Sequence, residues 1–377
     1  MKKADLLLIG QTPPPYHGQA VVTGMLFEHD WPGLDVHRLR MFYSNDIQDV
    51  GKASVGKLII LCVLVIKTWW IIFRYRPKIL YYPPASPNAV PVLRDIVYLG
   101  LVRWFFPKLV LHFHAGGLDQ FCAQRGIFGF FAKIMYARAD SAIDVNVTEP
   151  PSGKYFQAKC NLVVMNGVSV GDDNAVKVCD VQNKKFQILY VGLLCKEKGV
   201  FDLLETAKLL KELKIECEFV MVGAWKSDEV KENFESQASV NKVDKMFRFR
   251  GSLQGVDKWN AYAEADMFIF PTLHPTETFG MVVIEAMAYS LPIVASRWRG
   301  IPHVVGKDGC AILCDPGNAT EYAMAISRIA GDQSLREVME QRAAIRYRKY
   351  FTQKRFLARM EEVFKPMLID SKKEFIN

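Results

Sequence analysis

At 377 residues the chain exceeds the size at which one hydrophobic core keeps growing, which predicts two domains and excludes a single small module. Hydrophobic residues make up 50% and charged residues 23% of the chain, which excludes an intrinsically disordered protein. The formal net charge of +8 suits a nucleic-acid binder only where the charge is spread over an interface, so its position along the chain matters.

The whole basic excess lies in residues 51–110. Nine lysines and arginines stand there against one acid, Asp95, and nine minus one gives the +8 of the entire chain. Because the charge is confined to one stretch rich in apolar residues, we expect its partner to be a membrane surface and not a nucleic acid. The basic residues are Lys52, Lys57, Lys67, Arg74, Arg76, Lys78, Arg94, Arg103 and Lys108.

Two features predict a cytoplasmic protein without a metal site. The eight cysteines include no C-x-x-C pair and no spacing with histidine typical of metal ligands, so we interpret them as buried thiols in a reducing compartment. The apolar run that follows the first residues is too short for the core of a signal peptide. We therefore expect a buried strand over residues 5–9.

The first strand is followed by an irregular loop over residues 13–18, and a helix is expected from Gln19 onward. The loop carries His17 and Gly18 at its end. A plain structural turn and a loop that faces a ligand are both open at this point.

An apolar stretch at residues 58–73 is interrupted by Lys67 and followed by Arg74. About 20 apolar residues are needed to span a bilayer, and we expect this stretch to be too short. A core helix of the first domain and an interfacial helix remain open. Residues 96–106 repeat the combination of tryptophan, phenylalanine and arginine, and two such elements favour binding at a membrane surface.

Short buried strands are expected at residues 78–84, 109–114, 141–147 and 162–165. The second of them ends at His114, and the carboxyl end of a strand is where open α/β sheets bind ligands. His112 is the alternative, since strand alternation places both histidines on one face. A lone histidine is more often a hydrogen-bonded structural residue, so both interpretations stay open.

The polar stretch 170–185 has the composition of a linker, and we place the domain boundary there. Beyond it, strands and helices alternate, which predicts a second α/β domain. Strands are expected at 187–191, 218–222, 246–250 and 311–313, and helices at 200–213, 228–239, 257–264 and over most of 319–366.

Residues 265–303 predict a strand, a loop, a helix and a second strand. The loop enters the helix at Gly280, where unpaired N–H groups and the helix dipole favour an anion and the absence of a Cβ permits close approach. Glu277 lies on the loop and Glu285 inside the helix, with seven residues between them. Either the two acids face the hydroxyl-bearing parts of a sugar nucleotide, or Glu277 is a helix N-terminal charge favoured by the dipole and Glu285 is a solvated helix residue.

The stretch from Glu277 to Glu285, with the residues that follow it up to Ala295, resembles the Glu-x7-Glu signature of retaining glycosyltransferases of the GT-B fold, family 4. Further motifs occur in the family's order over residues 187–330. The likeness over residues 1–170 is carried by residues 13–18, 112–117 and 166–168. The motifs of the second half are Tyr190-Val191-Gly192, Lys198-Gly199, residues 219–223, residues 249–251 and residues 300–302.

This resemblance implies two Rossmann-like domains facing an interdomain cleft. Residues 1–170 would bind the acceptor, residues 185–350 would bind the nucleotide sugar, and a helix over about 350–377 would pack back on the first domain. The resemblance implies catalytic roles for Glu277 at the donor sugar and for His114, and places Gly18 and His17 in a cleft loop that is Gly-rich in the family. Donor-binding roles are implied for Glu285 at the ribose hydroxyls, Lys198 at the diphosphate, and Thr278, Phe279, Gly280 and Gly192.

The sequence departs from the family at two positions. Leu193 stands where members usually carry an arginine that grips the diphosphate, and His303 stands where they often have glutamate. Leucine cannot neutralise phosphate, so Lys196, Arg297 and Arg299 are candidates for the second positive charge.

The resemblance implies a metal-independent, retaining hexosyl transfer from a nucleoside diphosphate sugar, with UDP or GDP expected and no other cofactor. The acceptor would be a lipid-linked or surface-polysaccharide precursor of capsule, lipopolysaccharide or exopolysaccharide at the cytoplasmic membrane face. A sugar-nucleotide epimerase of the same fold and an inactive interaction protein remain alternatives. A Rossmann dehydrogenase is disfavoured, because no G-x-G-x-x-G follows the first strand.

Overall fold

The computed structural model describes residues 3–42, 55–147, 150–170 and 185–373. It divides into two compact units: unit 1 comprises Met1–Gly167 and Gln353–Asn377, and unit 2 comprises Val168–Thr352. Residues 171–184, where the sequence predicts most of the linker, and residues 51–54 of the basic stretch lie outside the described residues.

Unit 1 contains a parallel six-stranded sheet in the order β2-β1-β3-β4-β5-β6. The strands are β1 (Leu6–Gly10), β2 (Val36–Arg40), β3 (Ile79–Tyr82), β4 (Lys108–Phe113), β5 (Ser141–Asp144) and β6 (Asn161–Val163). The helices are α1 (Gly18–Glu28), α2 (Val55–Tyr75), α3 (Ala89–Val102), η2 (Arg103–Phe105), α4 (Leu118–Ala123), α5 (Gly126–Tyr136), α6 (Ser152–Tyr155) and α14 (Gln353–Lys373).

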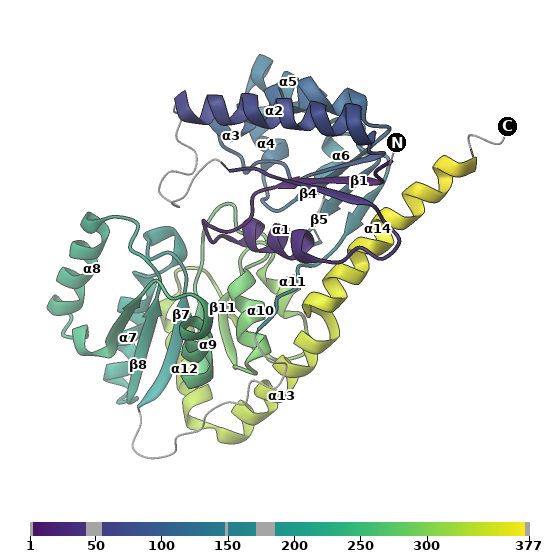
Figure 1. Cartoon of the computed structure of the whole chain (residues 1–377). Helices are drawn as coiled ribbons and strands as arrows, with labels where there is room; N and C mark the ends of the chain where they lie inside the picture. Colours follow the sequence, from purple (N-terminus) through teal and green to yellow (C-terminus); the bar gives the residue numbers. More distant parts are fainter. Residues whose placement is uncertain (1–2, 43–54, 148–149, 171–184, 374–377) are drawn as a thin grey trace. The chain divides into compact units, whose positions relative to one another are not determined.

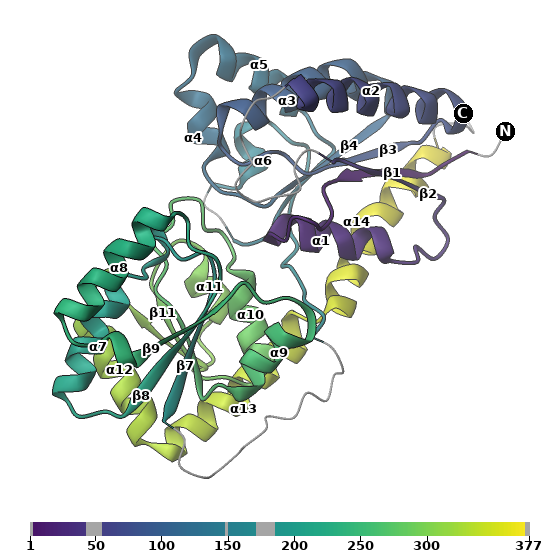
Figure 2. The same cartoon turned by 60° about the vertical axis from the view of Figure 1, so that its left-hand side comes forward.

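Both faces of this sheet are covered, so its inner strands β1, β3, β4 and β5 are buried on both sides, whereas the edge strands β2 and β6 are partly exposed. Helices α2, α3 and α5 lie on one side of the sheet, and α1 and α14 lie on the other (Figures 1 and 2). Strand alternation assigns the side chains: Leu80 and Tyr82 join the core under α2 and α3, whereas the Tyr81 ring lies 6.0 Å from the Phe364 ring of α14.

Helix α14 closes the second face of the unit 1 sheet, although it follows unit 2 in the chain. The Trp31 ring packs edge-on against Phe364 at 5.4 Å, and the His29 ring nitrogen lies 2.8 Å from the Glu361 carboxylate. The Lys108 ammonium donates to the Met367 carbonyl at 2.6 Å. Unit 1 is therefore built from two segments that are distant in sequence.

Helix α2 extends beyond the predicted apolar stretch 58–73 at both ends. Lys67 is exposed and does not interrupt the helix. At 21 residues, with a mean hydropathy of 2.1 in its most apolar window, it is long and apolar enough to cross a membrane; 33% of that window is buried. One face, including Leu64 and Ile71, packs into the core of unit 1. The opposite face remains apolar and exposed.

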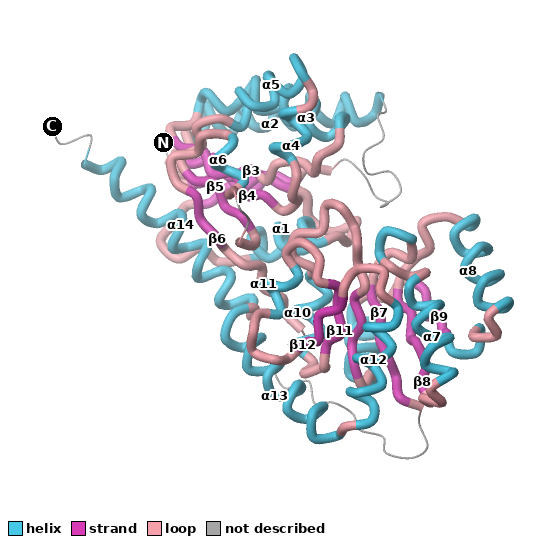
Figure 3. The backbone as a smooth tube through the Cα atoms, turned by 180° about the vertical axis from the view of Figure 1, so that it is seen from behind, coloured by secondary structure: helices cyan, strands magenta, loops and turns pink. Residues whose placement is uncertain are grey.

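Unit 2 contains a second parallel six-stranded sheet, in the order β12-β11-β10-β7-β8-β9 (Figure 3). The strands are β7 (Phe186–Val191), β8 (Cys217–Val222), β9 (Phe247–Gly251), β10 (Met267–Phe270), β11 (Ile293–Ser296) and β12 (Ala311–Cys314). The helices are η3 (Lys196–Lys198), α7 (Asp202–Glu212), α8 (Asp228–Val240), η4 (Asp244–Met246), α9 (Gly255–Glu264), α10 (Met281–Ala288), α11 (Ile301–Val305), α12 (Ala319–Gly331) and α13 (Gln333–Tyr350).

Counted from β7, the strand order of unit 2 is 3-2-1-4-5-6. This is the doubly wound order of the Rossmann fold, in which the chain proceeds outward in both directions from the two central strands. The order reverses between β7 and β10, which pair directly through Met267 and Ile188. The predicted fold class, α/β with two Rossmann-like sheets, is confirmed.

The elements that the sequence analysis did not predict are mostly in unit 1: β2, α4, α5 and α6. In unit 2 the predicted strand, loop, helix and strand of residues 265–303 are present as β10, α10 and β11. Gly280 is the residue that precedes α10, with a φ of 70°.

Candidate functional site

The carboxyl ends of β7 and β10 mark the switch point of the unit 2 sheet. Ligands of open α/β sheets bind outside these strand ends, where the chain leaves two neighbouring strands in opposite directions. Lys198 follows β7 in η3, and Glu277 follows β10 in the loop that leads to α10. Although they are distant in sequence, the topology brings these two segments together.

Lys198 and Glu277 form an ion pair at this position, with 2.5 Å between the Nζ and Oε2 atoms. Both side chains are partly buried, and the Thr272 hydroxyl lies 3.4 Å from the same carboxylate oxygen. The Lys198 ammonium is also 5.5 Å from the centre of the Phe270 ring. The structure thus joins the predicted diphosphate-binding lysine and the predicted donor-sugar carboxylate in one group.

The amino end of α10 follows Glu277 closely in the chain. A Cβ on Gly280 would approach the Ile301 Cδ1 atom to 2.8 Å, so the glycine is required by the protein's own packing as well as by its positive φ. The neighbouring Phe279 side chain is buried and packs edge-on against Phe351 at 5.9 Å, so it lies in the protein interior. Thr278, which precedes Phe279, is partly buried.

Glu285 lies in the second turn of α10 and is buried, with a side chain 6% exposed. Its Oε1 atom is 2.6 Å from the Lys258 ammonium, and its Oε2 atom accepts a hydrogen bond of 2.7 Å from the Tyr262 hydroxyl. Burial and the neighbouring Glu285 carboxylate hold the pKa of Tyr262 well above its usual value. Both motif glutamates are therefore paired with a lysine.

Sequence reasoning missed Lys258 and Tyr262, although a signal was present. The two residues are four positions apart on the predicted helix 257–264, which places them on one face. What the sequence did not provide was the packing of that helix, α9, against α10.

Residues 173–346 match the family description Glycosyl transferases group 1. Nearly all of unit 2 therefore resembles the catalytic domains of that family.

Several curated proteins resemble part of this chain. Sulfoquinovosyl transferase SQD2 of Arabidopsis thaliana is 29% identical over 178 residues, 46% of this chain and 32% of that protein. The capsular polysaccharide biosynthesis glycosyltransferase CapM of Staphylococcus aureus is 24% identical over 194 residues, 50% of this chain and 48% of that protein. The O-antigen chain mannosyltransferase B of Escherichia coli is 26% identical over 43% of this chain and 41% of that protein. The chain thus spans between a third and a half of the length of these relatives.

Solved structures match nearly the entire chain. Sucrose-phosphate synthase from Thermosynechococcus elongatus has a TM-score of 0.73 at 18% identity, over 97% of this chain and 100% of that chain. The Anabaena protein HepE in complex with UDP has a TM-score of 0.67 at 17% identity, over 96% of this chain and 100% of that chain. The fold is therefore the GT-B fold of glycosyltransferases.

Leu193, in place of the family arginine, lies in the turn after Gly192, and its carbonyl accepts a hydrogen bond of 3.0 Å from the Tyr190 hydroxyl. A Cβ on Gly192 would lie 3.2 Å from that hydroxyl, so the glycine keeps the turn close to β7. Of the candidate replacements, Arg297 is 3.4 Å from Asp315 and donates to the Leu313 carbonyl, both on or beside β12. Lys196 and Arg299 are exposed.

His274 is a further residue of unit 2 that the sequence analysis did not select. Its Nδ1 atom lies 3.2 Å from the Thr276 hydroxyl, and its carbonyl accepts a hydrogen bond of 2.9 Å from the Trp298 indole. Burial and the nearby positive charge of Lys198 lower the pKa of His274. The histidine is thus neutral near pH 7 and belongs to the same loop as Glu277.

The predicted residues of unit 1 also gather at a strand edge. The rings of His112 and His114, on and after β4, are 4.1 Å apart, and the Tyr81 hydroxyl lies 2.8 Å from His112 Nδ1. Burial, then the proximity of His17, lowers the pKa of His114 to about 3. His17 caps α1 by accepting a hydrogen bond of 3.3 Å from the Ala20 N–H, and Gly18 begins that helix.

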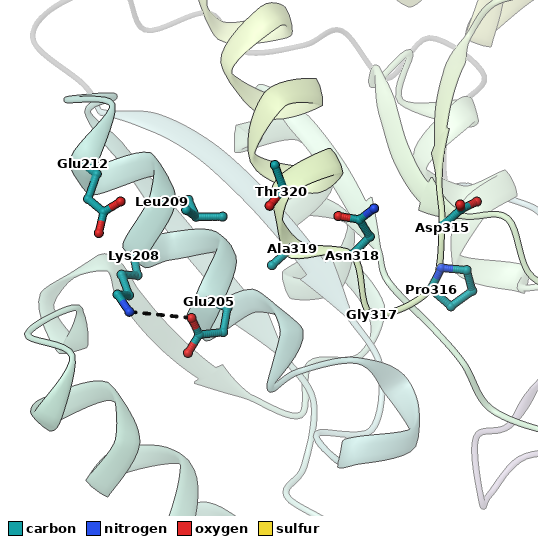
Figure 4. Close-up of a pocket in the computed structure, with 10 residues that line it drawn as sticks. All are labelled: Glu205, Lys208, Leu209, Glu212, Asp315, Pro316, Gly317, Asn318, Ala319 and Thr320. Atoms are coloured by element: carbon teal, nitrogen blue, oxygen red, sulfur yellow. Dashed lines mark ion pairs between the residues drawn. The ribbon is translucent and has the colours of Figure 1, made fainter.

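A separate hollow lies between α7 and the loop after β12 (Figure 4). Its lining includes Glu205, Lys208 and Asp315, and it contains none of the site residues above. Within the described ranges, no three His, Cys, Asp or Glu side chains converge to hold a metal ion.

Proposed function

We propose that the protein is a retaining family 4 glycosyltransferase that moves a sugar from a nucleoside diphosphate donor to a lipid-linked or surface-polysaccharide precursor. The observation that supports this most directly is the Lys198–Glu277 pair at the switch point, 2.5 Å apart. It combines a cation for the diphosphate with a carboxylate for the sugar at the place where this fold binds ligands.

The donor follows from the charges of the site. Lys198 and the N–H groups at the start of α10 favour a diphosphate, and Glu285 favours hydroxyl groups such as those of ribose. UDP or GDP is the expected nucleotide, and the HepE structure, which contains UDP, supports this choice. In our proposal these groups meet the diphosphate charge without a metal ion.

The transfer requires stabilisation of positive charge on the sugar as the diphosphate departs. Glu277 is the carboxylate assigned to this oxocarbenium-like state. Because Lys198 holds it, Glu277 is oriented before the donor arrives. We assign no covalent nucleophile; the acceptor attacks on the face from which the diphosphate leaves. His114 is neutral near pH 7, so its proposed contact with the donor sugar is a hydrogen bond and not general acid catalysis.

The acceptor class rests on the relatives. The functions of these relatives include capsular polysaccharide biosynthesis, O-antigen mannosyl transfer and, in Salmonella typhimurium, lipopolysaccharide N-acetylglucosamine transfer. In our proposal the acceptor carries a lipid anchor, so the enzyme works at a membrane. A surface of unit 1 supports this location.

That surface, called here the apolar face, consists of exposed large side chains on neighbouring elements. The indole N–H of Trp69 donates to the Leu101 carbonyl at 3.0 Å, and the rings of Phe73 and Phe105 lie 6.2 Å apart, which joins α2, α3 and η2 into one surface. Helix α5 packs beside α3 and extends it. The face comprises Val55, Leu58, Ile59, Val63, Ile66, Trp69, Trp70, Phe73, Val90, Leu93, Val97, Leu101, Trp104, Phe105, Ile127, Phe130 and Phe131.

Seven of the nine basic residues of the stretch divide into two groups. Lys78, Arg94, Arg103 and Lys108 bind groups of unit 1 itself: Asp5, Asp95, carbonyls of α5 and the Met367 carbonyl. Lys67, Arg74 and Arg76 are exposed on or just after α2. Exposed tryptophans flanked by lysine and arginine are typical of interfacial helices. We therefore propose peripheral binding to the inner face of the membrane through the apolar face and these three cations.

A thermal stability assay with UDP, GDP, ADP, CMP and their sugar conjugates tests the donor site, since a ligand that binds the native state raises the midpoint. A shift with one base, reduced in Glu285→Gln, is expected. The absence of a shift with every nucleotide would favour an inactive relative. Consumption of a nucleotide sugar without any acceptor would indicate the epimerase instead.

Sedimentation with vesicles of neutral or anionic lipid tests the membrane proposal. Trp70→Ser with Phe73→Ser is expected to reduce binding to both kinds of vesicle. The triple variant Lys67→Glu, Arg74→Glu and Arg76→Glu is expected to lose the preference for anionic lipid. Ile345→Ser, which alters a similarly exposed side chain of unit 2, is the control and should bind normally. Equal sedimentation of all variants would refute the proposed surface.

A further inference from the structure

Glu285 is held on both carboxylate oxygens by side chains of one helix. Lys258 Nζ lies 2.6 Å from Oε1, and the Tyr262 hydroxyl lies 2.7 Å from Oε2. Both donors come from α9, one turn apart, whereas Glu285 belongs to α10. The carboxylate is therefore fixed before any ligand is present.

Burial means that this carboxylate needs partners within the protein. The Glu285 side chain is 6% exposed and Tyr262 is fully buried, so an unpaired carboxylate there would lose its hydrogen bonds to water without replacement. An ionised carboxylate offers about four lone-pair positions, of which Lys258 and Tyr262 use two. Two acceptor positions remain, which matches the two donors of a vicinal diol.

A second contact, besides the ion pair, joins the two helices. The Tyr262 ring stacks on Tyr289, just beyond α10, at 5.7 Å, and Trp259 stacks on Tyr289 at 6.1 Å. This aromatic cluster joins α9 to the end of α10 without Lys258. The contact that Lys258 makes with α10 is with the Glu285 carboxylate itself.

We propose that Lys258 and Tyr262 are positioning residues that keep the Glu285 carboxylate oriented to accept hydrogen bonds from both ribose hydroxyls of the nucleotide donor. The inference rests on the proposed function, since it assigns a nucleotide to this site. It predicts that Lys258, acting through Glu285, determines the discrimination between ribonucleotides and 2′-deoxyribonucleotides.

The test compares each ribonucleotide with its 2′-deoxy counterpart: UDP with dUDP, GDP with dGDP, and ADP with dADP. Both members of a pair carry the same diphosphate, so the loss of the lysine charge cancels in the ratio of their dissociation constants. Titration calorimetry at fixed salt gives this ratio for the wild type, Lys258→Met, Glu285→Gln and the double variant. Lys258→Arg and Tyr262→Phe complete the set.

The wild type should prefer the ribonucleotide about 10- to 100-fold, the range expected for hydrogen bonds to a charged group. In Lys258→Met and in Glu285→Gln the ratio should fall to within about twofold of one, and the double variant should show no further loss. Lys258→Arg should retain the preference, and Tyr262→Phe should reduce it. The last variant removes one hydroxyl group, so it keeps the test open if Lys258→Met does not fold.

Four results would overturn the inference. A preference retained in Lys258→Met but lost in Glu285→Gln would make the lysine merely structural, and additive losses would show that it acts independently of Glu285. Equal affinity of the wild type for both members of each pair would remove the ribose contact while leaving the transferase proposal intact. If the wild type binds no nucleotide at all, the proposed function fails together with the inference.

Discussion

The carboxyl edges of the two sheets carry opposite kinds of polar group. In unit 2 the edge holds ionised pairs, Lys198 with Glu277 and Lys258 with Glu285, each within 2.6 Å. In unit 1 the corresponding edge holds His112 and His114, whose pKa values are lowered by burial so that both rings are neutral near pH 7.

This difference indicates what each edge can bind. Paired charges in a partly buried site can rearrange around an anion. The desolvation free energy of burying these charges is part of the folding of the protein and not of ligand binding. Neutral imidazoles offer one donor and one acceptor each and suit hydroxyl groups. In our proposal unit 2 therefore holds the diphosphate, with the ribose at Glu285, and the neutral imidazoles of unit 1 contact hydroxyl groups.

The largest expected effect is on catalysis at the charged edge. Glu277→Gln keeps the shape of the side chain but removes the charge that stabilises the sugar, so kcat should fall about 10²- to 10³-fold. Glu264→Gln is the matched control, since Glu264 is also an ion-paired glutamate of unit 2, 2.9 Å from Arg250. A similar loss in both variants would remove Glu277 from the reaction.

The second largest effect is expected on the affinity for the nucleotide. Lys198→Gln removes the cation and leaves the Glu277 carboxylate to repel the diphosphate, so the dissociation constant of the nucleoside diphosphate should rise roughly 10- to 100-fold. The increase should be smaller at high salt, which screens the repulsion. Calorimetry at two salt concentrations checks this, and an affinity equal to that of the wild type would separate Lys198 from the diphosphate.

The neutral edge predicts a dependence of stability on pH. A histidine whose folded pKa is about 3, against 6.5 in the unfolded chain, takes up a proton on unfolding between these values. Its contribution to stability is fully present above pH 6.5 and decreases as the pH falls, by at most about 1.4 kcal/mol per pH unit.

The free energy of unfolding of His114→Gln, measured in urea from pH 7 to pH 4.5, should therefore decline less steeply than that of the wild type. His303→Gln, which changes an exposed histidine of unit 2, should follow the wild type. Parallel curves for all three proteins would mean that His114 is charged in the folded state.

The smallest effect is expected at two cations that the sequence offered as replacements for the family arginine. Arg297→Gln and Lys196→Gln should change the nucleotide dissociation constant less than about twofold, because Arg297 is bound to Asp315 beside β12 and Lys196 is exposed. A tenfold loss in either variant would identify the replacement for the arginine that Leu193 displaces.

The central unit of the second domain was predictable because its signals are local. The apolar strands, the stop at Pro271 and the glycine before α10 each act within a few residues, and Glu277 and Glu285 were placed correctly on the loop and in the helix. The partners of these glutamates were not predictable, because Lys258 comes from a helix whose packing depends on the whole sheet.

Helix α5 escaped prediction for a related reason. Two glycines, Gly126 and Gly129, dilute its apolar pattern and lower its intrinsic helix propensity. The structure explains the second one: a Cβ on Gly129 would lie 1.8 Å from the Cys122 carbonyl oxygen, so the glycine permits α4 and α5 to pack closely. Gly129 is therefore required by the contact between two helices, although a glycine in the sequence normally indicates a weak helix.

Because α14 packs in unit 1, the order of synthesis on the ribosome affects when unit 1 can be completed. Domains usually complete in the order of synthesis, amino-terminal first. Here the first 167 residues emerge without the helix that supplies Phe364 and Glu361 to one face of their sheet. Unit 2 is synthesised between the two segments of unit 1 and can fold first, so unit 1 is completed only after unit 2.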